Sequence, residues 1–246
     1  MDKLLYVAMS GAKETLRAQA ANSHNLANAS TTGFKADLSA FQSRVVTGPG
    51  YAARVYATDS SVGWDRSAGA QITTGDPFDV AVQGTGFIAV QDSQGNEAYT
   101  RGGNLHVDPN GQLMTAAGLA VLGDNGPVSV PPFSSATVGP NGTISIVPLG
   151  QTPQTISKVG RIKLVNPPSD TISRSSDGLF RTSDGKPAEA DATTTLAAGV
   201  LEGSNVDLAG SMVNMIELSR NFDLQIKALH AAEDNASASA KLLQPS

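Results

Sequence analysis

Four short stretches of the sequence contain residue types that carry out chemistry in other proteins. Residues 84–89, GTGFIA, fit the G-x-G-x-x-A fingerprint of loops that bind dinucleotides. Residues 10–13, SGAK, fit the S-x-x-K element of serine acyl-transferases. Residues 108–111, DPNG, match the start of a calcium-binding loop, and residues 141–143, NGT, form a glycosylation sequon. Each of these functions requires a particular structural context.

The neighbouring sequence does not supply that context. A dinucleotide loop opens a helix whose N-terminal amides bind the pyrophosphate, but strand-like residues follow GTGFIA, so a hairpin is predicted. Ser10 lies in a helical stretch, and the S-D-N and K-T-G elements that accompany S-x-x-K are missing. No glutamate follows Asp108 at the distance that a calcium loop needs, so DPNG is predicted to be a turn. The sequon is another turn unless the protein enters a glycosylating compartment.

Histidine is the other candidate for chemistry, and the chain has 3. His24, His106 and His230 are far apart, and none has a second histidine or a cysteine four residues on, so no zinc site is predicted. Isolated histidines also give no basis for a Ser-His-Asp triad. His230 is predicted to be an interface or surface residue. We expect no catalytic residue, no metal and no cofactor, and we predict that the protein is not an enzyme.

Both ends of the chain have the hydrophobic spacing of helices. Near the N-terminus, positions spaced alternately four and three residues apart are mostly apolar: Leu5, Met9, Ala12, Leu16, Gln19, Ser23 and Leu26. The C-terminal stretch keeps the same alternation for longer: Leu208, Met212, Met215, Ser219, Phe222, Ile226, Leu229, Glu233, Ala236, Ala240 and Leu243. No Gly or Pro occurs between Ser211 and Gln244, so this is the clearest helix in the sequence.

The C-terminal stretch carries apolar or small residues on most of its faces. Ile216, Leu218 and Ala232 widen the stripe, and Val213 and Leu224 lie on the far side. A single amphipathic helix on a globular core is the commoner fate of an apolar stripe, but a helix like this one is usually buried on more than one side. Only one other long helix is predicted, so some of its partners are expected to belong to other molecules.

In the middle of the chain, from about residue 73 to residue 200, the hydrophobic period falls to two. Short β-type runs such as FDVAV, GFIAV and TISIV are separated by Asn-Gly and Asp-Gly turns. Such regular, short strands predict an antiparallel barrel or sandwich. Residues 42–73 show neither period and are rich in Gly, Ala and Ser, so an extended connector with one short strand at ARVYAT is predicted.

Composition excludes several classes of protein. The 246 residues carry a net charge of −5, which leaves no basic stripe for nucleic acid. No stretch approaches the roughly 20 apolar residues that cross a bilayer, so no membrane insertion is expected. The first 20 residues interleave too many polar side chains for a cleavable signal peptide. The chain has no cysteine and therefore no disulfide framework.

Three motifs carry a resemblance to a known family. The first is NLANASTTGFK at residues 25–35, and the second is the central stretch with QGTGF, YTR and GNL. The third is LEGSNVDLAGSMVNMIELSRNFDLQIKAL, near the C-terminus. They resemble, in this order, the Asn-rich signature (roughly N-N-L-A-N-x-x-T-x-G-F-K), a second signature and the C-terminal heptad helix of the flagellar basal-body rod and hook proteins, although His24 stands where the family has its first Asn. The opening, MDKLLYVAMSGA, and the length resemble the proximal-rod member of the family.

The resemblance implies a structural subunit of the bacterial flagellar rod, a helical assembly that crosses the periplasm and transmits torque. It implies copies of the same chain and other rod proteins as partners, and export through the flagellar type III apparatus without a cleaved signal peptide. It also implies that the terminal segments are largely unfolded in the monomer and become coiled-coil-like helices on assembly. Ordering them then costs conformational entropy that burial by neighbours offsets.

The sequence therefore predicts an α+β fold with discontinuous, coiled-coil-like terminal helices and an antiparallel β-rich middle domain. We expect an N-terminal helix and turn at 1–40, a connector at 41–72, a β-rich domain at 73–203 and a heptad helix at 204–246. The assembly interface is predicted at sixteen residues: Leu5, Met9, Ala12, Leu16, Asn25, Leu26, Asn28, Gly33, Phe34, Leu208, Met212, Met215, Phe222, Ile226, Leu229 and Ala236.

Three alternatives stay open at this point. The chain resembles other axial members of the same family, in the distal rod or the hook. An exported β-domain that binds a carbohydrate or surface ligand, with the helices as an oligomerising stalk, is disfavoured because 1 Trp and 4 Tyr leave little for sugar stacking. A hydrolase with a carboxylate pair is disfavoured because Asp residues that precede Gly or Pro, such as Asp108 and Asp177, are already explained by predicted turns.

Overall fold

The computed structural model describes residues 3–45, 55–152, 154–175 and 177–242, which form two compact units. One unit, called here the helical unit, takes its residues from the segments 1–29, 36–65 and 206–246. The other, called the β domain, consists of the segments 30–35 and 66–205. The α+β fold class is confirmed, with a helix near each end of the chain and antiparallel sheets between them.

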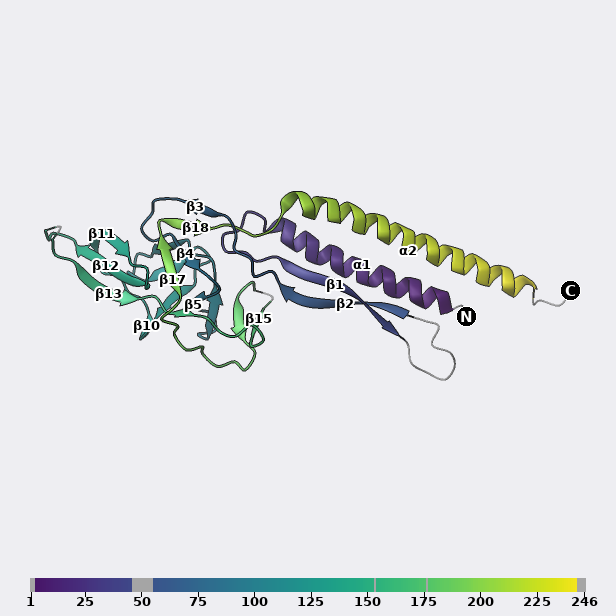
Figure 1. Cartoon of the computed structure of the whole chain (residues 1–246), viewed down its shortest axis with the longest axis horizontal. Coiled ribbons are helices and arrows are strands. Elements are labelled where there is room, and N and C mark those ends of the chain that lie inside the picture. Colours follow the sequence, from purple (N-terminus) through teal and green to yellow (C-terminus); the bar gives the residue numbers. More distant parts are fainter. Residues whose placement is uncertain (1–2, 46–54, 153, 176, 243–246) are drawn as a thin grey trace. The chain divides into compact units, whose positions relative to one another are not determined.

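The helical unit contains two long helices that lie side by side and a two-stranded antiparallel sheet along the first of them (Figure 1). Its elements are α1(Lys3–Ala27), β1(Asp37–Val45), β2(Val55–Trp64) and α2(Leu208–Leu242). The helix α2 begins after Asp207, whose carboxylate accepts a hydrogen bond from the amide of Ala209 at 3.1 Å, as an N-cap does. Neither described helix is long and apolar enough to span a bilayer.

The sheet of the helical unit was not predicted, although the strand expected at ARVYAT overlaps the start of β2 at Val55. The sequence suggests an extended connector over residues 41–72, whereas β1 and β2 pair from Asp37↔Trp64 to Val45↔Val55, with an irregularity between Leu38 and Ser39 that shifts the register. Both strands consist largely of small and polar residues, so hydrophobic alternation gives no signal while the backbone ladder still forms. The two units divide the chain near residues 65 and 205, whereas the predicted β-rich domain runs from 73 to 203.

The β domain is built from short antiparallel strands in four sheets (Figure 1). The largest sheet has the order β15-β16-β6-β5-β9-β8-β7, with β10 on β9 and β14 on β5, and the smaller ones are β11-β12-β13, β17-β4 and β18-β3. The strands are β3(Gln71–Thr73), β4(Val80–Gln83), β5(Phe87–Gln91), β6(Glu97–Thr100), β7(Leu105–Val107), β8(Leu113–Thr115), β9(Ala120–Gly123), β10(Gly126–Pro127), β11(Phe133–Val138), β12(Thr143–Pro148), β13(Ser157–Arg161), β14(Leu164–Val165), β15(Ile172–Arg174), β16(Phe180–Thr182), β17(Thr195–Ala198) and β18(Val200–Glu202).

Alternating residues of these strands form one hydrophobic core. It includes Val80, Ile88, Val90, Ile144 and Ile162, all of them fully buried. Edge-to-face packing of the rings of Phe78 and Phe133, 5.6 Å apart, adds to the same core. The β domain therefore has enough buried apolar surface to hold its loops in place.

Two of the chemistry-like stretches are turns, as predicted. The carboxylate of Asp108 accepts hydrogen bonds from the amides of Asn110 and Gln112, so its oxygens serve the turn itself. These hydrogen bonds, the one from Gln112 foremost, hold the pKa of Asp108 below its ordinary value. At the sequon, the side-chain oxygen of Asn141 accepts a hydrogen bond from the amide of Thr143 at 3.2 Å.

Candidate assembly interface

The face of α1 that is buried within the helical unit consists of small and polar residues. Six of its buried positions repeat at three- and four-residue intervals: Ala8, Ala12, Thr15, Ala18, Asn22 and Asn25; Glu14 is buried as well. At Gly11, an added Cβ would lie 2.9 Å from the side-chain amide of Gln225 on α2, so the two helices approach closely there. Small residues allow this approach, and large apolar side chains on α1 are left for other faces.

Except for Ala12 and Asn25, the predicted interface residues of α1 lie beside this buried face. Met9 is 52% exposed and Leu16 is 49% exposed, Leu5 is also exposed, and Leu26 is half-buried. Ala12 alone belongs both to the predicted stripe and to the residues that are buried within the unit. The stripe of large apolar residues and the intramolecular packing face of α1 are therefore different sets.

The helix α2 shows the same division. Leu218 and Ala232 are buried, and the predicted residues Met215, Phe222, Ile226 and Leu229 are half-buried. The predicted residues Leu208 and Met212 are exposed, and Ala236 lies in the last third of the helix. Large exposed apolar side chains of the two helices form what we call the apolar surface: Leu5, Tyr6, Met9, Leu16, Leu208, Met212, Val213, Ile216 and Leu224.

Asparagine side chains connect the end of α1 to its neighbours in the helical unit. Asn22 donates a hydrogen bond from Nδ2 to the carbonyl of Ser211 in the first turn of α2, at 2.8 Å. Asn25 donates from Nδ2 to the carbonyl of Asp37 at 2.9 Å and accepts from the Asp37 amide at 2.7 Å, as a neighbouring strand would. Asn28 donates to the carbonyl of His24 in the last turn of α1 at 2.9 Å. These bonds fix where α1 ends and where β1 begins.

His24, the position that departs from the family pattern, also contacts Asp37. Its Nδ1 lies 2.6 Å from a carboxylate oxygen of Asp37, and the histidine side chain is half-exposed. Asp37 is therefore held through its backbone by Asn25 and through its carboxylate by His24.

We expect Asn25→Ala to destabilise the helical unit by about 1–3 kcal/mol, because it removes both hydrogen bonds between the buried side-chain amide of Asn25 and the backbone of Asp37. The free energy of unfolding and the exchange rate of the Asp37 amide measure the effect. Asn28→Ala is the matched control: it removes a bond to the carbonyl of His24 in the last turn of α1, so a smaller loss than for Asn25→Ala is expected. Equal losses for both variants would contradict the assigned role of Asn25.

The second half of the Asn-rich motif belongs to the β domain. Gly33 has φ of 70° and donates its amide to the carbonyl of Glu202 at 2.8 Å. A Cβ at Gly33 would lie 2.2 Å from the carbonyl carbon of Arg101, so no larger residue fits. Phe34 is buried, with the guanidinium of Arg174 4.3 Å from the centre of its ring. The predicted interface residues Gly33 and Phe34 thus pack inside the β domain.

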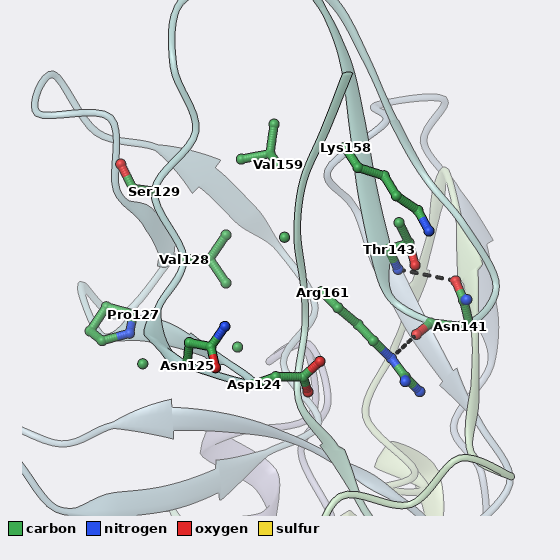
Figure 2. A pocket seen from close by; sticks show the side chains of 13 residues that line it. Asp124, Asn125, Pro127, Val128, Ser129, Asn141, Thr143, Lys158, Val159 and Arg161 are labelled. Carbon is green, nitrogen blue, oxygen red and sulfur yellow. Dashed lines mark hydrogen bonds between the residues drawn. The ribbon is translucent and has the colours of Figure 1, made fainter. Parts of the chain in front are cut away.

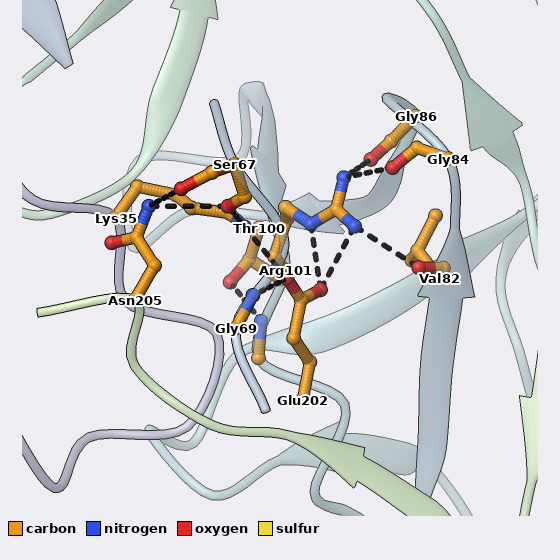
Figure 3. Close-up of polar contacts among 11 residues, drawn as sticks. Lys35, Ser67, Gly69, Val82, Gly84, Gly86, Thr100, Arg101, Glu202 and Asn205 are labelled. Atoms are coloured by element: carbon orange, nitrogen blue, oxygen red, sulfur yellow. Dashed lines mark hydrogen bonds and ion pairs between the residues drawn. The ribbon is translucent and has the colours of Figure 1, made fainter. Parts of the chain in front are cut away.

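Arg101 is the centre of a buried charge cluster in the β domain (Figure 3). It is 3% exposed, and its guanidinium donates to the carbonyls of Val82, Gly84 and Gly86 at 2.8–3.0 Å. Its Nε and one terminal nitrogen both lie 2.8 Å from Oε2 of Glu202. All three guanidinium nitrogens therefore have acceptors, as a buried charge requires.

Lys35 and Glu202 complete this cluster. The ammonium of Lys35, whose side chain is fully buried, lies 2.6 Å from Oε1 of Glu202 and donates to the carbonyl of Ser67 at 2.6 Å. The amide of Gly69 also donates to Oε1 of Glu202, at 3.0 Å. Burial raises the pKa of Glu202, but the hydrogen bond from Lys35 and the charge of Arg101 outweigh it and hold the pKa below its ordinary value.

Comparison with known proteins identifies the family. Family models match residues 5–35 (flagella basal body rod protein), 81–146 (flagellar hook protein FlgE/F/G D1 domain) and 197–242 (flagellar basal body rod FlgEFG protein C-terminal). Over 252 residues, covering 100% of both chains, the sequence is 41% identical to the flagellar basal-body rod protein FlgF of Escherichia coli (strain K12). This chain belongs to the flagellar basal-body rod protein family.

Other members of the family are also similar to this chain over most of its length. FlgF of Salmonella typhimurium (strain LT2) is 42% identical over 100% of both chains. A rod protein FlgG, from Buchnera aphidicola subsp. Schizaphis graminum, is 31% identical and covers 86% of this chain and 88% of its own length. The similarity to these two FlgF proteins is both higher and more complete than the similarity to this FlgG, which agrees with the expected likeness to the proximal-rod member.

The three regions that match the family models of rod proteins each supply one charge to the buried cluster. Lys35 ends the first region, Arg101 lies in the second and Glu202 lies in the third. The glycine-rich stretch 84–89 also contributes to the buried charge cluster. The carbonyls of Gly84 and Gly86 accept hydrogen bonds from Arg101, whereas a dinucleotide loop would direct its amides to a phosphate. The predicted hairpin there is wrong: β4 pairs with β17 and β5 with β6 and β9, so the stretch is a corner between sheets.

Sequence reasoning did not find this cluster, although all three residues stand in or beside recognised motifs. Glu202 lies 167 positions from Lys35 and 101 positions from Arg101, so no local spacing connects them. One sequence feature could have indicated the cluster: each of the three motifs contains a charged residue close to a glycine. A charged residue in such a place is equally compatible with an exposed position and with a buried ion pair, so the feature does not predict the cluster.

The β domain of this rod protein also has an open pocket of about 580 Å³ between the β9–β10 turn and the strand β13 (Figure 2). Asp124, Lys158 and Arg161 line it, and Nε of Arg161 donates to the carbonyl of Asn141 at 2.8 Å. Its described lining residues include no histidine and no aromatic ring. A sugar would have no ring to stack on there, so the pocket gives no support to the carbohydrate-binding alternative. In the part of the chain that the structure describes, no His, Asp and Glu group is arranged to hold a metal ion.

Proposed function

We propose that this protein is a structural subunit of the flagellar basal-body rod and that its place is the proximal part of the rod. It acts without enzymatic activity, by polymerising with copies of itself and with other rod proteins such as FlgG. The full-length similarity to proteins named FlgF, together with the apolar surface of α1 and α2, supports this function. The proposed location is the periplasmic rod, reached through the flagellar type III export apparatus without a cleaved signal peptide.

The apolar surface is the observation that carries the assembly mechanism. Ile216 and Met212 on α2 and Met9 on α1 are more than half exposed, while the opposite sides of both helices pack within the unit. Neighbouring subunits would bury these side chains and turn the helix pair into a coiled-coil-like bundle. A helical assembly requires that one patch meets a different patch on the next subunit, which α1 and α2 supply. The assignment of the sixteen predicted residues to the assembly interface remains a proposal. Within it, Gly33 and Phe34 would contribute indirectly, because they pack inside the β domain.

A strain without the gene tests this function. We expect it to stop flagellar construction at the base and to lose swimming, and complementation with an epitope-tagged chain should restore both. Electron microscopy of labelled, purified basal bodies should then find the tag in the rod. Complete rods and normal swimming in the deletion strain would overturn the proposal.

A further inference from the structure

Two contacts between the antiparallel helices α1 and α2 depend on particular side chains (Figure 1). In the first, called here the polar contact, Asn22 donates from Nδ2 to the carbonyl of Ser211 at 2.8 Å, and its Oδ1 accepts from Nδ2 of Asn214 at 3.5 Å. In the second, called here the glycine contact, the side-chain amide of Gln225 lies over Gly11, where an added Cβ would be 2.9 Å from the amide carbon. Each contact requires its own pair of residue types.

The polar contact and the glycine contact have the same spacing on both helices. Gly11 and Asn22 are 11 residues apart on α1, and Asn214 and Gln225 are 11 residues apart on α2. Since a turn takes about 3.6 residues, this spacing is close to three turns, and both contacts lie on one face of each helix. They therefore agree on a single alignment, in which Asn22 is level with Asn214 along the helix axes and Gly11 is level with Gln225.

The rest of the buried face of α1 does little to select this alignment. It consists in large part of the alanines Ala8, Ala12 and Ala18, which present the same methyl group to α2. A shift of α1 by one turn would keep a similar apolar area out of water, so the hydrophobic effect hardly distinguishes the shifted alignment from the observed one. Discrimination between the two must come from polarity and shape.

A shift of one turn breaks both contacts. Moved four residues toward the C-terminal end of α2, Asn22 would be level with Leu218, which is apolar and 5% exposed. An amide that is buried against an apolar side chain loses its hydrogen bonds, which is unfavourable. In the same alignment Gln225 would be level with Thr15, whose side chain would fill the space that the glycine leaves open. Moved one turn the other way, Gln225 would be level with the β-branched Val7.

We propose that the polar contact and the glycine contact fix the register of α1 on α2, with Asn22 and Gln225 as positioning residues. In coiled coils, one buried asparagine specifies the register at some cost in stability, and Asn22 is 6% exposed. The glycine contact adds a steric requirement, because Gly11 alone leaves room for the long side chain of Gln225. This inference concerns the pairing of the two helices and does not depend on the proposed function.

The register matters for the apolar surface because both helices contribute to it. Met9 and Leu16 come from α1, and Met212 and Ile216 come from α2. A shift of one turn moves every residue of α1 by about 6 Å relative to α2, so the same side chains would form a surface of different shape. A molecule that fits the surface in one register would not fit it in the other. The two contacts thus preserve a single apolar surface.

Disulfide formation between introduced cysteines of the full-length chain measures the register, and the natural chain has no cysteine that would interfere. Ala8→Cys with Ala228→Cys reports the proposed register, in which these positions are level. Ala8→Cys with Ala232→Cys reports the shift of one turn. Because a disulfide requires Cα atoms within about 7 Å, the first pair should have an effective concentration in a glutathione buffer at least about tenfold above that of the second. We call this quotient the register ratio.

Asn22→Leu should lower the register ratio to about threefold or less while the helical content and the thermal midpoint of the chain are kept or rise, since leucine adds apolar contact. A residue with a merely structural role would not show this combination. Asn221→Leu is the matched control: it makes the same change at an exposed position of α2 and should leave the register ratio unchanged.

Gln225→Ala covers the case in which Asn22→Leu disturbs folding. It removes the glycine contact, leaves the polar contact in place and should also lower the register ratio. The proposal is overturned if both cysteine pairs form disulfides equally well in the otherwise unchanged chain, or if Asn22→Leu keeps the register ratio. It is also overturned if Asn22→Leu and Gln225→Ala each lower the helical content together with the ratio, as residues that only stabilise the pair would.

Discussion

Replacement of Arg101 by methionine is expected to lower the free energy of unfolding of the β domain by roughly 3–5 kcal/mol. The substitution keeps much of the side-chain volume but removes every guanidinium donor. Three backbone carbonyls then lose their hydrogen bonds, and the carboxylate of Glu202 stays buried with Lys35 as its remaining counter-charge. Urea unfolding of the full-length chain, followed through a β-domain signal, measures the loss.

Arg181 provides the matched control for this prediction. It pairs with Asp92 and Asp177 at 2.9 and 2.7 Å, but its side chain is 29% exposed. Partly exposed ion pairs contribute about 1 kcal/mol or less, so Arg181→Met should cost far less than Arg101→Met. Similar losses of the free energy of unfolding for the two variants would show that burial does not make the Arg101 interactions more stabilising than those of Arg181.

The pH dependence of the Arg101 variant gives a second readout. The pKa of Glu202 is lowered in the folded chain, so its stabilising contribution is complete above the ordinary glutamate pKa of about 4.3 and is lost as the pH falls through the folded value. Without Arg101 that pKa rises, and Glu202 takes up a proton at a higher pH. The difference between wild type and variant should therefore be smaller at pH 4 than at pH 7.

The helices and turns of this protein could be predicted because their signals are local. The helix α2 follows from a long apolar alternation without Gly or Pro, and turns such as 108–111 follow from Asx chemistry over four residues. The β1–β2 sheet was missed because its residues are mostly small and polar, so only the backbone ladder defines it. The intramolecular face of α1 was missed for a related reason: Ala8, Thr15 and Asn22 carry little hydrophobic signal, although they pack closely.

The charge cluster illustrates what the sequence alone does not supply. Lys35 stands in the Asn-rich motif and Arg101 in the central one, yet nothing local indicates that both bind Glu202. The connection depends on how β18 pairs with β3, which brings Glu202 opposite Gln71 and close to Gly69. Pairing between distant short strands is a property of the whole domain, so the motifs were recognisable while their physical role was not.

Ile216→Asp is expected to abolish rod assembly and swimming while changing the free energy of unfolding of the monomer by about 0.5 kcal/mol or less. The side chain of Ile216 is 69% exposed on α2, in the apolar surface, so the free chain tolerates a charge there. In the proposed rod the same position is covered by a neighbouring subunit, and a buried, unpaired carboxylate is strongly unfavourable. Swimming assays and electron microscopy of basal bodies measure assembly, and urea unfolding measures the monomer.

Two matched variants separate assembly from folding. Asn221→Asp puts the same charge on another exposed part of α2 and should support swimming. Leu218→Asp puts it on the face that packs within the helical unit, where Leu218 is 5% exposed, so this variant should lose monomer stability as well as assembly. Phe222→Asp and Leu229→Asp are half-buried on that side and should combine both effects. If Ile216→Asp still builds rods, then the exposed side of α2 is not an assembly surface, and the contacts between subunits must use other residues.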